Sequence, residues 1–94
     1  METHFIVHDK ADTVGVMVVE NARPGQDLTG WIMETDETIS VEAKDAVPLG
    51  HKVALKDIGT GDTLLKDGHD IGKAVGDIGQ GRHAHIHNVK TKRW

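Results

Sequence analysis

Apolar and polar residues alternate with a period of two along most of the chain, as in strands that bury one face and expose the other. Gly, Asp or Pro separates the short apolar runs, so each expected strand is brief. The pattern predicts strands over 4–8, 13–20, 28–34, 38–43, 51–55, 62–65, 73–77 and 83–89. We therefore expect a mainly β protein with a single domain over 1–94, because 94 residues leave no room for a second core.

Turn signals lie between these strands. Pro presets φ at about −65° and Gly accepts positive φ, so Arg23-Pro24-Gly25 and Val47-Pro48-Leu49-Gly50 are predicted to reverse the chain. Eight of the eleven glycines fall within 50–81, which is typical of a compact fold with many tight corners. Short helical turns are expected at Ala54–Ile58, where Gly59 stands as a C-cap, and within 21–28. No internal repeat is recognised.

Composition narrows the class of protein. With one Phe, two Trp and no Tyr, the core must be built from aliphatic side chains. The absence of Cys removes disulfides and thiolate chemistry, fits a reducing compartment and leaves His as the obvious metal ligand. No apolar run reaches the roughly 18–20 residues of a membrane span, and METHFIVHDK lacks the pattern of a signal peptide. We expect a cytoplasmic protein without a membrane partner.

Charge is unevenly distributed along the chain. The net charge is −4, yet residues 82–94 contain four basic residues and no acid, while the preceding part is strongly acidic. Nucleic-acid binding would need a basic stripe over the whole domain, so we expect no nucleic-acid partner. The basic end suits a small anion or an acidic protein partner.

Three of the seven histidines, His83, His85 and His87, occupy alternate positions in HAHIHN. In a strand they would share one face, with neighbours ~6.7 Å apart and the outer two ~13 Å apart at Cα. At most two of them can then meet one Fe²⁺ or Zn²⁺ ion, and a carboxylate, a third His or a partner chain must complete the site. The alternative is an exposed polar strand face.

Two lysines stand close to turns. Lys52 follows His51 and precedes an apolar stretch, so it is a base, a cation that holds a substrate carboxylate, or a solvated residue at a strand start. Lys66, before Asp67-Gly68, has the same alternatives. His8 and Asp12 are either a His–carboxylate pair or, as we favour, two polar turn residues.

Several catalytic classes are disfavoured. There is no Gly-x-Ser-x-Gly segment and no Cys, which argues against covalent acyl transfer. Gly72-Lys73-Ala74 lacks the hydroxyl that a phosphate-binding loop places on Mg²⁺.

A resemblance extends over about 4–88. The order His8-x-x-x-Asp12, VPLGHKVALKDIGTGD, LLKDGHDIG and AVGDIGQGRHAHIHN is similar to the small N-terminal domain of altronate and galactarate dehydratases, which has the β-clip fold of the SAF group. The ending KTKRW looks most like the small subunits of the related sulfo-lyases, in which this domain is a separate polypeptide paired with a large subunit.

The resemblance implies a β-elimination in which sulfite leaves C3 of a 3-sulfo-2-hydroxypropanoate and the remaining enol becomes pyruvate. It also implies a requirement for Fe²⁺, which the large subunit shares or mainly holds. The chain alone should then be inactive. The alternatives are the detached small subunit of a sugar-acid dehydratase, which eliminates water, and a non-catalytic β-clip binding module.

Site residues follow from matching motifs. Gly50-His51-Lys52 matches the family's GHK, and His85-x-His87-Asn88 its HVHN. Lys66-Asp67-Gly68 matches KYG, with Asp67 where the family usually has Tyr. Thr13 stands where Asn is common. His51, Lys52 and Lys66 are expected to gather around the substrate's carboxylate and sulfonate. The resemblance thus implies catalytic Lys52 and His51, substrate-binding Lys66, His85 and Asn88, and the metal ligands His85 and His87 at the interface with the large subunit.

Overall fold

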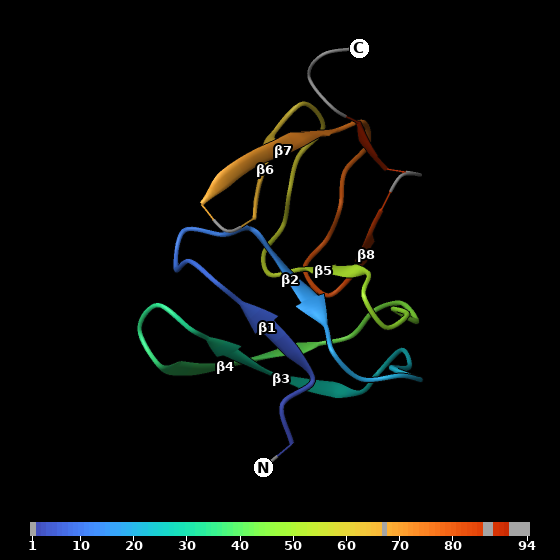
Figure 1. The fold of residues 1–94 in the computed structure, drawn as a ribbon. Coiled ribbons are helices and arrows are strands. Elements are labelled where there is room, and N and C mark those ends of the chain that lie inside the picture. The colour runs from blue at the N-terminus through green and yellow to red at the C-terminus, as the bar shows by residue number, and fades with distance from the viewer. Residues whose placement is uncertain (1, 67, 86–87, 91–94) are drawn as a thin grey trace.

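The computed structural model describes residues 2–66, 68–85 and 88–90, and in these residues it contains strands and no helix. The described residues form nine short strands, whose arrangement can be followed in Figure 1. They are β1 (Phe5–Val7), β2 (Val14–Met17), β3 (Asp27–Ile32), β4 (Glu37–Glu42), β5 (Lys52–Ala54), β6 (Thr63–Lys66), β7 (His69–Ala74), β8 (His83–Ala84) and β9 (Val89–Lys90). The expectation of a mainly β fold is confirmed.

The strands form two sheets. The larger sheet has the order β4-β3-β1-β2-β5-β8, and the smaller has the order β6-β7-β9. β1 and β3 run parallel, whereas the other neighbours are antiparallel. The β6–β7 hairpin lies above the larger sheet in Figure 1.

Two strands depart from the predicted ranges. β7 covers His69–Ala74 rather than 73–77, because the hairpin turns at Gly68 and the irregular register beside Leu64 and Leu65 accommodates Gly72 within the strand. The single strand expected over 83–89 is wrong. β8 ends at Ala84, and the His85 carbonyl accepts the N–H of Val89, where β9 begins.

The two helical turns are also wrong. The segment Ala54–Ile58 bends instead, because the Ile58 backbone bridges Ile78 and the Asp57 carboxylate accepts the Gln80 N–H at 2.8 Å. In 21–28 the chain forms a tight turn around Gly25 and enters β3. Side-chain and bridge contacts from distant segments therefore replace local helical bonds at both places.

The same type of turn occurs four times in the described residues, and the sequence analysis did not predict this repeat. An apolar residue is followed three positions later by a Gly with φ between 82° and 87°, at Gly25, Gly50, Gly61 and Gly81. In each copy the N–H of the next residue bonds the carbonyl three positions back, as in a type II turn, which requires positive φ at this position. The leading apolar residues bridge in pairs, Ala22 with Val47 and Ile58 with Ile78. Only the apolar residue and the Gly are shared, so the repeat is faint in the sequence.

The core consists of two clusters. Phe5 is fully buried in the first, and its ring lies over Gly15 and Gly30 in the two neighbouring strands. A Cβ added at Gly15 would lie 2.7 Å from the ring. The second cluster packs Leu64 and Ala74 of the smaller sheet against the larger one, where Val14, Ala54 and Ala84 face them. The larger sheet thus has buried residues on both faces.

Candidate metal centre

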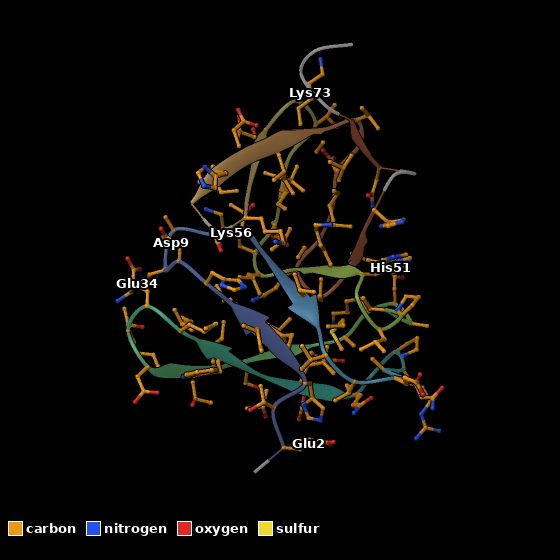
Figure 2. The ribbon with its side chains drawn as sticks, in the orientation of Figure 1. Glu2, Asp9, Glu34, His51, Lys56 and Lys73 are labelled. Atoms are coloured by element: carbon orange, nitrogen blue, oxygen red, sulfur yellow. The ribbon has the colours of Figure 1, made fainter. Side chains whose placement is uncertain are left out.

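Three histidines meet at the outer edge of the larger sheet. One ring nitrogen from each of His51, His83 and His85 lies within 4.8 Å of the others. Nδ1 of His51 is 2.8 Å from Nε2 of His83, and the rings of His51 and His85 stack with centroids 3.9 Å apart. All three side chains are half-buried. Figure 2 shows His51 beside β5 and β8, at the side of the molecule.

Strand register explains why these residues meet. Val53 pairs with His83 and Lys52 with Ala84, so the next pair outward is His51 with His85. Side chains alternate between faces along each strand, which puts His51, His83 and His85 on the face of Val53. His51 is further fixed by its carbonyl, which accepts the Met17 N–H at 2.9 Å. The cluster therefore extends the first core cluster to the edge of the sheet.

Asn88 holds the backbone that carries two of the histidines. Its Oδ1 accepts the His85 N–H at 2.9 Å, and its Nδ2 donates to the His83 carbonyl at 2.8 Å. The Asn88 N–H in turn bonds the His85 carbonyl at 3.0 Å. The side-chain amide predicted to bind substrate is thus engaged with the chain itself, and it positions His83 and His85.

Asp45 supports the same segment from the other side. Its Oδ2 accepts the His83 N–H, and its Oδ1 pairs with Arg82, each at 2.9 Å. Burial on its own would raise the pKa of Asp45, but the hydrogen bond from His83 and the hydrogen bond and charge of Arg82 outweigh it. The pKa of this carboxyl is therefore below its usual value.

Replacing Asp45 with Asn is expected to lower the melting temperature at pH 7. A lowered folded-state pKa means that the ionised carboxylate stabilises the fold above the ordinary Asp pKa of about 3.9, and that this contribution is lost as pH falls through the folded value. The difference between wild type and Asp45→Asn should accordingly shrink below about pH 4 in thermal unfolding followed by circular dichroism. Asp27→Asn, at an exposed carboxylate of β3, is the control. A difference that stays constant from pH 7 to pH 3 would contradict the assignment.

Within the described residues of this chain, His51, Lys52 and Lys66 do not lie together. Lys52 pairs with Val16 and Ala84, so its side chain lies on one face of the sheet and the side chain of His51 lies on the other. β6 ends at Lys66, two residues before Gly68. The Gly68 N–H donates to the Asp12 carboxylate at 2.8 Å. That hairpin end lies near Asp9, across the molecule from His51 in Figure 2.

Asp12 has a structural role in this chain. Besides Gly68, it accepts the Asp9 N–H at 3.2 Å, and it is 7% exposed. The reading of Asp12 as a turn residue agrees with these bonds. Its carboxylate ties the β1–β2 loop to the β6–β7 hairpin.

Of the two metal ligands that the resemblance implies, His85 belongs to the cluster and His87 lies outside the described residues, as does Asp67. His51 supplies the third ligand that the sequence required from elsewhere. The sequence does not single out His83 within HAHIHN, because the pairing of β8 with β5, which brings His83 beside His51, is not a local property of the sequence.

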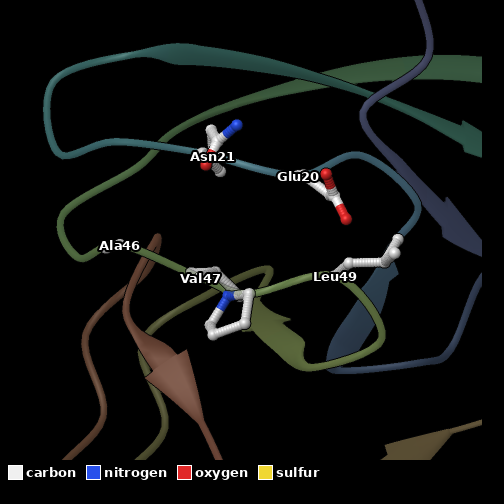
Figure 3. A pocket seen from close by; sticks show the side chains of 7 residues that line it. Glu20, Asn21, Ala46, Val47 and Leu49 are labelled. Atoms are coloured by element: carbon white, nitrogen blue, oxygen red, sulfur yellow. The ribbon is translucent and has the colours of Figure 1, made fainter.

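The donor set suits a first-row transition ion. Neutral imidazole binds Fe, Zn, Ni and Cu, and three half-buried imidazoles leave further coordination positions for substrate or another chain. A nearby groove of about 540 Å³ between residues 20–22 and 46–49 includes none of these histidines. Figure 3 shows Glu20 and Leu49 at its sides. The candidate metal ligands therefore lie at the sheet edge and not in this groove.

Known proteins resemble the chain over most of its length. Residues 3–92 match the altronate/galactarate dehydratase SAF domain. The chain belongs to this family. It is 53% identical over 94 residues to the (2R)-sulfolactate sulfo-lyase subunit alpha of Chromohalobacter salexigens, with complete coverage of both chains. The subunit alpha of Paracoccus pantotrophus is 60% identical over 52 residues, covering 55% of this chain and 78% of that protein.

A more distant relative has the same domain within a larger protein. The altronate dehydratase of Bacillus subtilis is 37% identical over 87 residues, which is 93% of this chain but 16% of that enzyme. Membership of the SAF family agrees with the β-clip architecture predicted from the sequence. No helix in the described part of the chain is long and apolar enough to cross a membrane.

Proposed function

We propose that this chain is the small, alpha subunit of a lyase that eliminates sulfite from (2R)-3-sulfolactate to give pyruvate, acting with a large catalytic subunit. The observation that carries the proposal is the 53% identity over the full length of the C. salexigens alpha subunit. The alternative is a small subunit of a sugar-acid dehydratase, which the 37% identity to altronate dehydratase supports more distantly. A non-catalytic binding module is disfavoured by the histidine cluster.

The proposed reaction is a β-elimination. A base takes the C2 proton, the C2–C3 double bond forms, and the C3–S bond breaks with its electron pair leaving on sulfite. The enol product then gains a proton at C3, loses its hydroxyl proton and becomes pyruvate. When bound, Fe²⁺ supplies a Lewis acid beside the substrate's carboxylate and hydroxyl.

In this proposal the chain's own residues hold and orient the metal. His51, His83 and His85 provide the imidazoles, and Asn88 and Asp45 keep the backbone of His83 and His85 in place. Such supporting hydrogen bonds fix the orientation of metal ligands. We propose that the large subunit shares the iron and completes its ligands, so the alpha chain is inactive alone. The lack of Cys supports a cytoplasmic location.

The two lysines have different places in the proposal. Lys52 is not assigned to the metal centre, because its side chain lies on the sheet face opposite to the three histidines. Lys66 lies far from the histidine cluster of its own chain. It could bind the substrate only if the large subunit brought the β6–β7 hairpin near the metal centre of another alpha chain, so this role stays a prediction.

Co-expression with the large subunit from the same genome tests the proposal. We expect the purified complex to release sulfite and pyruvate in equal amounts from (2R)-sulfolactate, only after loading with Fe²⁺, while the alpha chain alone gives no product. The control substrate is altronate. Elimination of water from altronate, with no sulfite from sulfolactate, would instead support the dehydratase alternative.

A further inference from the structure

A row of side chains crosses the larger sheet on the face opposite to Phe5 and the histidine cluster. Register pairs connect one residue in each of the six strands, and directly paired residues share a face. In sheet order the row is Thr38, Trp31, Ile6, Val16, Lys52 and Ala84.

Only one end of this face is covered. The second core cluster buries Ala84 at the β8 end. Farther along, Ile6 and Val16 are half-buried, and Trp31 is 36% exposed. Alternation adds two neighbours to this face, Val18 at 41% and Met33 at 43% exposure. Three of the five exposed large apolar side chains of the described residues therefore gather here.

Lys52 lies within this apolar row. It is half-buried between Val16 and Ala84, and no hydrogen bond or ion pair is found for its ammonium group among the described residues. A cation that is partly removed from water is stabilised when a carboxylate pairs with it. The row itself contains no carboxylate, and the Asp36 carboxylate beside it already accepts the Trp31 Nε1–H at 2.8 Å. We therefore expect the carboxylate opposite Lys52 to come from a different protein.

We propose that this face docks the large subunit of the enzyme, through an apolar segment that carries an Asp or Glu opposite Lys52. The inference rests on the proposed function, which supplies the partner. Trp31 suits such a contact, because Trp gives a large apolar area and is enriched at interface centres. This contact would lie on the face opposite to the histidine cluster, so a different part of the large subunit would complete the ligands of the iron at the sheet edge.

Matched substitutions test the docking face. Val18→Glu places a charge on it, whereas Val75→Glu changes a valine of nearly equal exposure, 41% against 42%, outside it. Lys52→Glu reverses the charge at the centre. Each chain is titrated onto the immobilised, purified large subunit, and thermal unfolding verifies that each is folded. We expect Val18→Glu and Lys52→Glu to raise Kd about tenfold or more, and Val75→Glu to leave it within about twofold.

The outcomes separate the docking inference from the proposed function. Wild-type Kd values for folded Val18→Glu and Lys52→Glu would overturn the docking face even if the complex releases sulfite. If the two substitutions weaken binding to the large subunit but the assembled complex releases no sulfite, the docking face stands and the proposed function is wrong. If light scattering shows that the wild-type chain dimerises alone and Val18→Glu abolishes the dimer, the occupant is a second copy and the proposal is wrong.

Discussion

Replacing any one of His51, His83 and His85 with Ala is expected to lower sulfite release by the assembled enzyme at least about 100-fold. Even residues that only support a metal ligand typically contribute 10–100-fold to affinity or activity, and the loss of an imidazole removes the ligand itself. A 100-fold loss corresponds to about 2.7 kcal/mol of transition-state stabilisation. The three variants should behave alike, because each removes one nitrogen from the same cluster.

Metal binding provides a readout that is independent of activity. We expect each Ala variant to bind Ni²⁺ or Co²⁺, measured by calorimetry on the isolated chain, at least about tenfold more weakly than wild type. His69→Ala is the matched control, since His69 is an exposed histidine of β7 outside the cluster. Wild-type affinity and turnover in all three cluster variants would mean that the imidazoles only pack against one another.

The sequence predicted the strands well because alternation is a local property. Most strands of the larger sheet fall within the predicted ranges, and the β character follows from short apolar runs between turn residues. The prediction of a helical turn at Ala54–Ile58 was wrong because the Asp57 carboxylate accepts the Gln80 N–H from a turn distant in the sequence. A local pattern carries no information about such a contact.

The site was predictable only in part for the same reason. The resemblance of His85-x-His87-Asn88 to the family motif selected His85, but the cluster is made by the pairing of β5 with β8. His51 and Lys52 are adjacent in the sequence, and the motif treated them as one unit. In a strand, adjacency places side chains on opposite faces, so the structure divides them between the metal centre and the uncovered face. Register between strands is the missing information.

The packing of Phe5 gives the largest expected effect on stability. In the strands on both sides of Phe5, glycines lie under its ring, and a Cβ at Gly30 would overlap the ring atoms. Gly30→Ala should therefore lower the free energy of unfolding by about 2–4 kcal/mol, since neither Phe5 nor the buried β3 backbone has room to move. Domains of this size are stable by only about 5–15 kcal/mol. We expect the melting temperature to fall by about 10 °C or more.

A double-mutant cycle identifies the ring as the cause. Phe5→Leu removes the ring atoms that meet the new Cβ, so the double variant with Gly30→Ala should be more stable than the sum of the two single effects allows, by about 1 kcal/mol or more. Gly76→Ala is the control, because an added Cβ there meets nothing within 4 Å. Additive effects in urea unfolding would place the cost in the β3 backbone instead. Coupling would show that Phe5 requires glycine at position 30. Phe5 pairs with Met17, whose N–H donates to the His51 carbonyl, so the strand that carries Phe5 also supports the backbone of His51.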